Sequence, residues 1–211
     1  MERVAQGRSA ISPSSSAAIE GCLVRLRPIQ EEDLPLVLEW RNSVEVRKYL
    51  LNDQPIPLEA HRQWFESLEK DNRRRVFLIV SREDRPLGLV QLFAIDRENG
   101  HAEWGFYVAD PELRRAGFGP EVEYLILCCA FDELGLQRVY CHTLASNRAV
   151  LALHERFGFQ QEGVLRMHVR RGNQYEDLVV MGILHEEFEQ VRPRLVTILR
   201  GIADRQGGQQ P

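Results

Sequence analysis

The sequence predicts a single α/β domain of the α+β kind, in which helices flank a mixed and mostly antiparallel sheet of about seven strands. Two patterns lead to this fold. Apolar residues alternate with a period of two over 75–81, 87–96 and 102–108, and short turn signals at 83–86 and Asn99-Gly100 separate these runs, which indicates antiparallel hairpins. A helical pattern then intervenes before the next strand at 138–144, and this strand-helix-strand passage requires a parallel pair.

The N-terminal half of the domain is predicted to be mainly helical. Residues 22–29 alternate apolar and basic side chains like a half-buried strand. The segment 30–42 follows with an acidic first turn and an apolar face, which is typical of an amphipathic helix. A short helix is expected over 44–51, and Pro57 stands where the next helix should begin.

The C-terminal half is predicted to alternate helices and strands. Pro120 suits the first turn of a helix, because its missing N–H is not needed there. A further helix is expected from about Asn147 to Phe157, closed by Gly158 as a left-handed cap. Two strands at 159–171 and 174–184, joined by a Gly172-Asn173 turn, complete the sheet.

Both ends of the chain are predicted to be tails outside the domain. Residues 1–20 are rich in Ser and Ala and lack periodicity, so we expect a disordered tail, with an organelle transit peptide as the alternative. Residues 191–211 are expected to hold the end of a helix and a second tail. The domain itself is then predicted to cover 21–190, which is within the usual size of one domain.

Composition narrows the classes of partner. The net charge of −4 disfavours nucleic acid and anionic membranes, which normally need a basic field. No apolar segment approaches the ~20 residues that cross a bilayer, so we expect a soluble, cytoplasmic protein. The four cysteines are interpreted as reduced core residues, and neither they nor the six histidines show the spacing of a metal site.

The segment RRAGFGP before the Pro120 helix has the composition of an anion site. Gly117 and Gly119 remove side chains from the turn, so that backbone amides can approach a ligand. The positive end of the helix dipole, together with Arg114 and Arg115, would suit a pyrophosphate. A tight strand-to-helix turn without a ligand is the alternative.

Taken with the later run NRAVLALHERFGF, this loop resembles the motifs of the GNAT superfamily of N-acetyltransferases over about residues 22–185. The resemblance implies acetyl-coenzyme A as co-substrate, with no metal. Its pyrophosphate would lie on the loop, its pantetheine arm along the strand before it, and the family's helix asparagine would be Asn147. The cofactor-binding residues implied are Phe106, Tyr107, Val108, Arg114, Arg115, Ala116, Gly117, Phe118, Gly119 and Asn147.

The catalytic groups implied are His154 and Glu103. His154 stands where the family most often has tyrosine, and an imidazole can protonate the departing thiolate at neutral pH; alternatively it is only a helix-surface residue next to Glu155. Glu103 is expected to accept the proton of the amine, although it can equally orient the ammonium or face solvent. His142 is the second candidate base. An oxyanion would meet a backbone N–H near Tyr107 or Val108, freed if this strand bulges.

The N-terminal half resembles the branch that acetylates UDP-4-amino-4,6-dideoxy-N-acetyl-β-L-altrosamine in pseudaminic acid synthesis, on patterns such as WRN, VRK and EAHRQWF. The substrate-binding residues implied are Arg41, His61, Trp64, Gln91 and Tyr107. Trp64 can instead be a helix-packing aromatic. Rival acceptors are spermidine and the N-termini of ribosomal proteins, and a non-catalytic coenzyme A-binding module is a further alternative. We expect a small-molecule amine as partner and leave a homodimer open.

Overall fold

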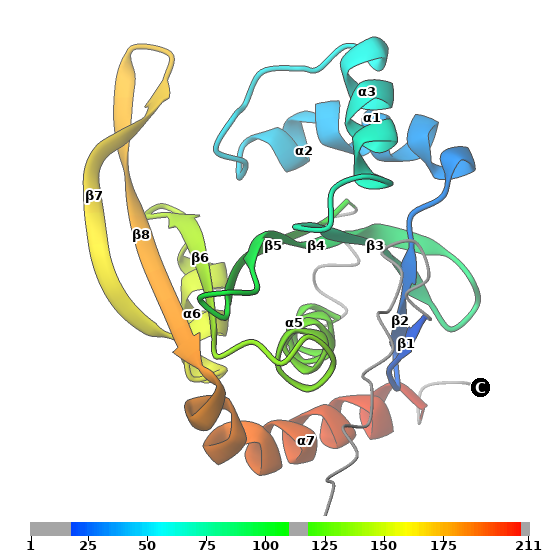
Figure 1. Ribbon diagram of the computed structural model, residues 1–211, viewed down its shortest axis with the longest axis vertical. Coiled ribbons are helices and arrows are strands. Elements are labelled where there is room, and N and C mark those ends of the chain that lie inside the picture. Colours follow the sequence, from blue (N-terminus) through cyan, green and yellow to red (C-terminus); the bar gives the residue numbers. More distant parts are fainter. Residues whose placement is uncertain (1–17, 110–117, 208–211) are drawn as a thin grey trace, which may run out of the picture.

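The computed structural model describes residues 18–109 and 118–207. An eight-stranded sheet in the order β1-β2-β3-β4-β5-β6-β8-β7 forms its middle layer (Figure 1). The strands are β1 Ile19–Glu20, β2 Val24–Pro28, β3 Arg75–Ser81, β4 Pro86–Asp96, β5 His101–Val108, β6 Arg138–Leu144, β7 Gln160–Arg171 and β8 Gln174–Leu184. The helices are α1 Leu34–Asn42, α2 Val44–Arg47, α3 Leu58–Leu68, α5 Gly119–Cys128, α6 Arg148–Arg156 and α7 His185–Gly207.

Helices cover both faces of the sheet. Figure 1 shows α1, α2 and α3 on one side and α5 and α7 on the other. Every residue of β3 is buried for this reason, and its side chains alternate between two cores. Leu78 packs in the cluster under α1 and α3, whereas Phe77 and Ile79 belong to the larger cluster formed with α5 and α7.

The parallel pair of β5 and β6 is short, and this places the site. Its register runs from His101 opposite Arg138 to Glu103 opposite Tyr140. Beyond this point β5 continues to Val108 and β6 to Leu144, each still paired with its other neighbour. The two strands therefore part in the middle of the sheet, and the parallel pair predicted from the sequence is confirmed.

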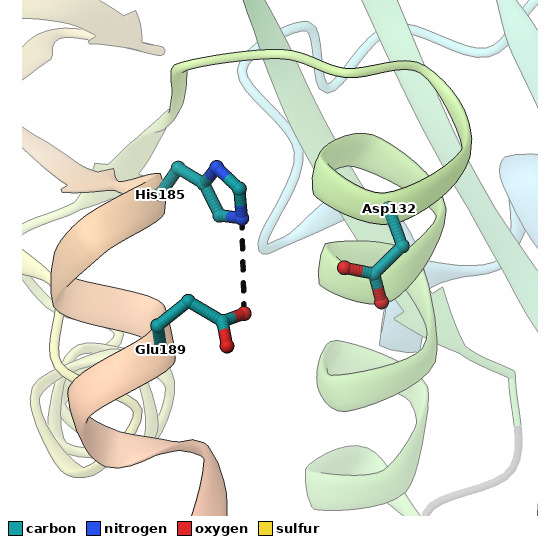
Figure 2. A group of neighbouring side chains, drawn as sticks. All are labelled: Asp132, His185 and Glu189. Carbon is teal, nitrogen blue, oxygen red and sulfur yellow. Dashed lines mark ion pairs between the residues drawn. The ribbon is translucent and has the colours of Figure 1, made fainter.

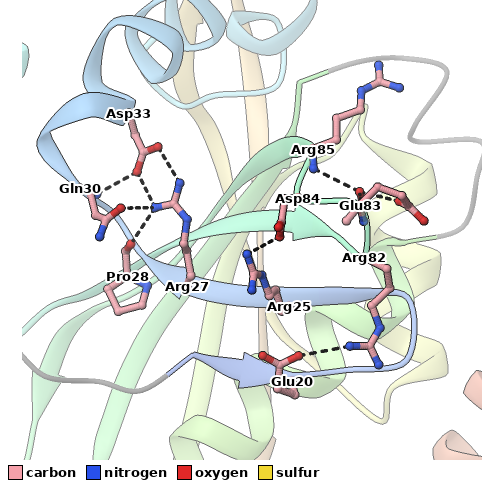
Figure 3. A network of polar contacts seen from close by, with 11 residues as sticks. Glu20, Arg25, Arg27, Pro28, Gln30, Asp33, Arg82, Glu83, Asp84 and Arg85 are labelled. Atoms are coloured by element: carbon pink, nitrogen blue, oxygen red, sulfur yellow. Dashed lines mark hydrogen bonds and ion pairs between the residues drawn. The ribbon is translucent and has the colours of Figure 1, made fainter.

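Polar contacts fix the first strands to the rest of the domain (Figure 3). Arg27 forms two hydrogen bonds with Asp33, at 2.7 and 2.8 Å, and so joins β2 to the 3₁₀ turn before α1. Arg25 pairs with Asp84 in the β3–β4 turn. On the α5 side the buried carboxylate of Glu121 accepts the backbone N–H groups of Cys22, Leu23 and Val24 at 2.6 to 2.8 Å.

The predicted turns are confirmed by their backbone angles. Gly100, Gly158 and Gly172 all have positive φ, at 72°, 94° and 58°. The bulge that would free a backbone N–H near Tyr107 or Val108 is not present, because Glu103 to Val108 stay in continuous register with β4. The irregularity lies instead between Phe93 and Asp96, where Ala94 has a φ of 49°.

Two elements extend into the predicted tails. The two-residue strand β1, at Ile19 and Glu20, pairs with β2 inside the segment expected to be disordered; residues 1–17 lie outside the described part. Helix α7 continues to Gly207, because Phe188, Leu195 and Leu199 form a buried stripe along it. None of the described helices is long and apolar enough to span a membrane.

Candidate active site

A cavity of about 440 Å³ opens where β5 and β6 part. Its walls come from α2, the diverging ends of β5 and β6, the first turn of α5 and the length of α6. The helices α1, α2 and α3 on one side of the sheet (Figure 1) are called the helical cap below. The cavity reaches from this helical cap to the start of α5 on the other side of the sheet. The lining residues that the argument uses are Tyr107, Gly119, Cys141, His142, Asn147 and His154.

The predicted cofactor residues that the structure describes gather at this cavity. Phe106, Tyr107, Val108, Gly119 and Asn147 line it, and Phe118 packs against the larger core beside it. Arg114, Arg115, Ala116 and Gly117 lie outside the described residues.

Gly119 and Asn147 fit a bound ligand. A Cβ at Gly119 would meet Leu153 Cδ2 at 3.5 Å, an ordinary contact, so protein packing does not require glycine there. The missing side chain instead leaves room in the cavity next to the helix N-terminus. Asn147 caps α6 without a side-chain hydrogen bond to the helix, which leaves its amide available to a ligand.

His154 does not lie on a helix surface. It is 2% exposed and lines the cavity, with its Nδ1 at 3.0 Å from Oε1 of Glu123, a fully buried residue of α5. Trp104 meets the imidazole edge-on and Phe159 packs beside it. The alternative that His154 is a surface neighbour of Glu155 is therefore wrong.

The pKa values of His154 and Glu123 are both raised. Burial alone would lower the pKa of His154, but the charge of Glu123 and hydrogen bonds with Cys141 and Glu123 outweigh it and raise that pKa to about 10. Burial in turn raises the pKa of Glu123, against the opposing effect of His154. Both shifts are upward, so at neutral pH the pair holds a proton that free histidine would largely have lost.

Glu103 and His142 form a second acid–base pair, on the α1–α3 face of the sheet. Their side chains, 17% and 24% exposed, meet at 2.7 Å between Oε1 and Nδ1. Glu103 belongs to the last paired rung of β5 and β6, and His142 lies two residues beyond its partner Tyr140. His142 lines the cavity and Glu103 does not. The two residues predicted as rival bases are therefore one hydrogen-bonded unit, with the imidazole as the cavity-facing member.

The predicted acceptor residues are only partly brought to the cavity. Tyr107 lines it, and Arg41 lies close enough to oppose the upward shift that burial produces in the pKa of Tyr107. Arg41 itself donates to the backbone carbonyls of Asn52 and Gln54, and so holds the loop before α3.

The other three predicted acceptor residues, His61, Trp64 and Gln91, are not among the described residues that line the cavity. His61 is buried and stacks on Trp64, whose ring packs on the core under α1 and α3, as expected of a helix-packing aromatic. Oε1 of Gln91 and Nε2 of His61 are buried and lack a hydrogen-bond partner among the described residues. Such atoms usually find a water or a ligand.

One further group has the composition of a metal site. Asp132, His185 and Glu189 place their ligand atoms within 4.8 Å of one another, between the end of the α5 segment and α7 (Figure 2). Arg192 already binds both carboxylates, at 2.7 Å to Asp132 and 2.7 Å to Glu189. The group is explained as an ion-pair network that ties α7 to the chain after α5.

Sequence reasoning missed Glu123. The signal was available, because Glu123 stands in the otherwise apolar run VEYLILCC, where a carboxylate must face the core. Its partner, however, comes from another helix 31 residues along the chain.

Comparison with known proteins identifies the family of the chain. Residues 24–160, more than half of the chain, match the family model described as an acetyltransferase (GNAT) domain. The chain belongs to the GNAT acetyltransferase family. It is therefore an N-acetyltransferase that uses acetyl-coenzyme A, and it has the mixed sheet of that fold.

Three relatives illustrate the range of likeness. The uncharacterized N-acetyltransferase YokL of Bacillus subtilis is 33% identical over 78% of this chain and 91% of its own length. The spermidine N(1)-acetyltransferase of Escherichia coli K12 is 26% identical over 78% of this chain and 88% of its own. The crystal structure of the Vibrio cholerae spermidine N-acetyltransferase with CoA and spermine superposes with a TM-score of 0.74 at 25% identity, covering 78% of this chain and 97% of that one.

Proposed function

We propose that this acetyltransferase acts on the 4-amino group of a UDP-4-amino-4,6-dideoxy sugar, the acceptor implied by the sequence resemblance. The observation that carries the proposal is the charge of the cavity. Among its described lining residues there is no aspartate or glutamate. A polyamine cation would need such carboxylates to offset the loss of its hydration, whereas a sugar does not.

The helical cap supports an anionic acceptor. Arg41, Arg47 and Lys48 lie on α1 and at the end of α2, beside the part of the cavity wall formed by Val46 and Leu50. Lys48 is paired with Glu45, but Nε of Arg47 is buried and has no hydrogen-bond partner among the described residues. Arg47 therefore has donor capacity left for a diphosphate.

In this proposal the Glu103–His142 and Glu123–His154 pairs carry out the proton transfers. The amine must be neutral to attack the thioester carbon, and His142 accepts its proton while Glu103 holds the imidazole in place. On the other side His154 gives a proton to the departing sulfur. His142→Ala should lower kcat by about a hundredfold, in line with the usual contribution of a general base, and Glu103→Gln should cost less.

Spermidine is the second candidate, because relatives named as spermidine acetyltransferases cover most of the chain. The deciding experiment measures thiol release from acetyl-coenzyme A with a UDP-4-amino sugar, the same amino sugar without UDP, and spermidine. We expect release with the nucleotide sugar only, and a raised KM for it in Arg47→Gln. Release with spermidine alone would replace the sugar by the polyamine.

A further inference from the structure

We propose that Glu123 is a positioning residue for catalysis: its carboxylate fixes the orientation and the charge of His154 so that the opposite edge of the imidazole presents a proton to the cavity. This inference rests on the role assigned to His154 in the proposed function. It concerns a residue that neither the sequence motifs nor the comparison with relatives singled out.

The geometry restrains the ring from every side. Nδ1 points to Glu123 on α5, and the aromatic rings of Trp104 and Phe159 enclose the imidazole at centroid distances of 5.2 Å each. The ring cannot turn without losing the Glu123 contact. With Nδ1 held by Glu123, Nε2 is the ring nitrogen left for other partners, and the cavity is lined by His154 and by Cys141, whose thiol also hydrogen-bonds the imidazole.

The charge argument points the same way. The titratable groups that face His154 are Glu123 from α5 and the Cys141 thiol from β6. Glu123 is fully buried, and its second oxygen, Oε2, lacks a hydrogen-bond partner among the described residues. A buried carboxylate with few hydrogen bonds is stable in a core chiefly when a cation beside it offsets the loss of hydration. His154 is the group positioned to be that cation.

The chemical step balances. As the amine nitrogen bonds to the acetyl carbon, it passes a proton to His142, the carbon–sulfur bond breaks and sulfur keeps the electron pair. His154 donates the Nε2 proton to that sulfur, which leaves as the neutral thiol. The imidazole stays hydrogen-bonded to Glu123 through Nδ1 and is reprotonated from solvent.

The test compares Glu123→Gln with Glu121→Gln, the same substitution at a neighbouring buried carboxylate of α5 that contacts the backbone of the β1–β2 turn and β2 rather than His154. NMR titration of the His154 ring should show a pKa lowered by Glu123→Gln and unmoved by Glu121→Gln. For thiol release we expect Glu123→Gln to lower kcat at least about tenfold with little change in KM, and to make kcat fall as pH rises.

Two further variants keep the outcome decisive. Glu123→Asp retains the charge one methylene farther away and should restore part of the ring pKa, even if Glu123→Gln fails to fold. The double variant Glu123→Gln/His154→Ala should be no slower than His154→Ala alone, because both changes remove one function. An unshifted ring pKa, or additive losses in the double variant, would overturn the proposal. Failure of the proposed acceptor would show in the wild-type enzyme instead, whereas the ring titration needs no acceptor.

Discussion

The buried carboxylate of Glu121 is expected to hold the N-terminal strands on the start of α5. It is 3% exposed and accepts three backbone N–H groups, from Cys22, Leu23 and Val24, at 2.6, 2.7 and 2.8 Å. Gly21 belongs to the same arrangement, since a Cβ there would come within 2.8 Å of the Glu121 carboxyl carbon. The carboxylate therefore supplies the hydrogen-bond acceptor for these three backbone N–H groups.

Glu121→Ala should cost about 3–5 kcal/mol of the free energy of unfolding. Each hydrogen bond to a charged group contributes roughly 1.5–3 kcal/mol. The three donors share one carboxylate and Cys22 is reachable by water, so the total is less than their sum. Glu121→Gln should lose about 1–2 kcal/mol, because the remaining oxygen can still accept the N–H groups of Leu23 and Val24.

Urea unfolding followed by circular dichroism measures this loss directly. The matched control is Glu20→Gln, in β1 just before this turn, whose carboxylate is exposed and pairs with Arg82 at 3.3 Å; it should change stability by less than about 0.5 kcal/mol. If Glu121→Ala stays within about 1 kcal/mol of the wild type, the N–H groups have other partners and the reasoning is wrong.

Three other changes test separate parts of the structure. Gly158→Ala should cost about 1–2 kcal/mol in urea unfolding, because its φ is 94° and the new Cβ would lie 3.3 Å from the methyl groups of Val191. Arg171→Ala breaks the contact of β7 with Asp53 in the loop before α3. The KM for the acceptor should rise, while the free energy of unfolding changes by less than about 1 kcal/mol. An unchanged KM would show that the contact does not shape the cavity. Burial lowers the pKa of His61, so the unfolded chain binds more protons below pH ~6.5 and the wild type should lose stability as pH falls through that region. His61→Gln should flatten this dependence, and an equally steep loss in the variant would assign it to other groups.

Strand positions could be predicted closely because two signals coincided. β3, β6 and β8 have the bounds expected from the sequence, because turn residues lie close to these apolar runs, such as Asp84 after β3 and Gly172-Asn173 before β8. β1 could not be predicted in this way. It has two residues, too few to show a period, and it exists through its pairing with β2.

Contacts between side chains were harder to predict from the sequence than the strands were. His61 and His154 both stand on amphipathic helices, and nothing in their spacing says whether an imidazole faces a cavity or a neighbouring helix. In the structure His154 lines the cavity, whereas His61 is buried and does not line it. The Glu103–His142 and Glu123–His154 pairs depend on which strands and helices become neighbours, and local patterns do not contain that information.

The end of the β5–β6 register explains how one cavity can serve the two acid–base pairs of the proposed mechanism. Side chains alternate across a strand, so Glu103 and His142 face the α1–α3 side while their chain neighbours Trp104 and Cys141 face α5. Because the strands part just there, one cavity reaches both faces. In the proposed mechanism the partly exposed pair accepts a proton from the amine, and the buried pair supplies a proton to the departing thiol. A sheet that stayed paired to the end of β5 would keep these two chemistries apart.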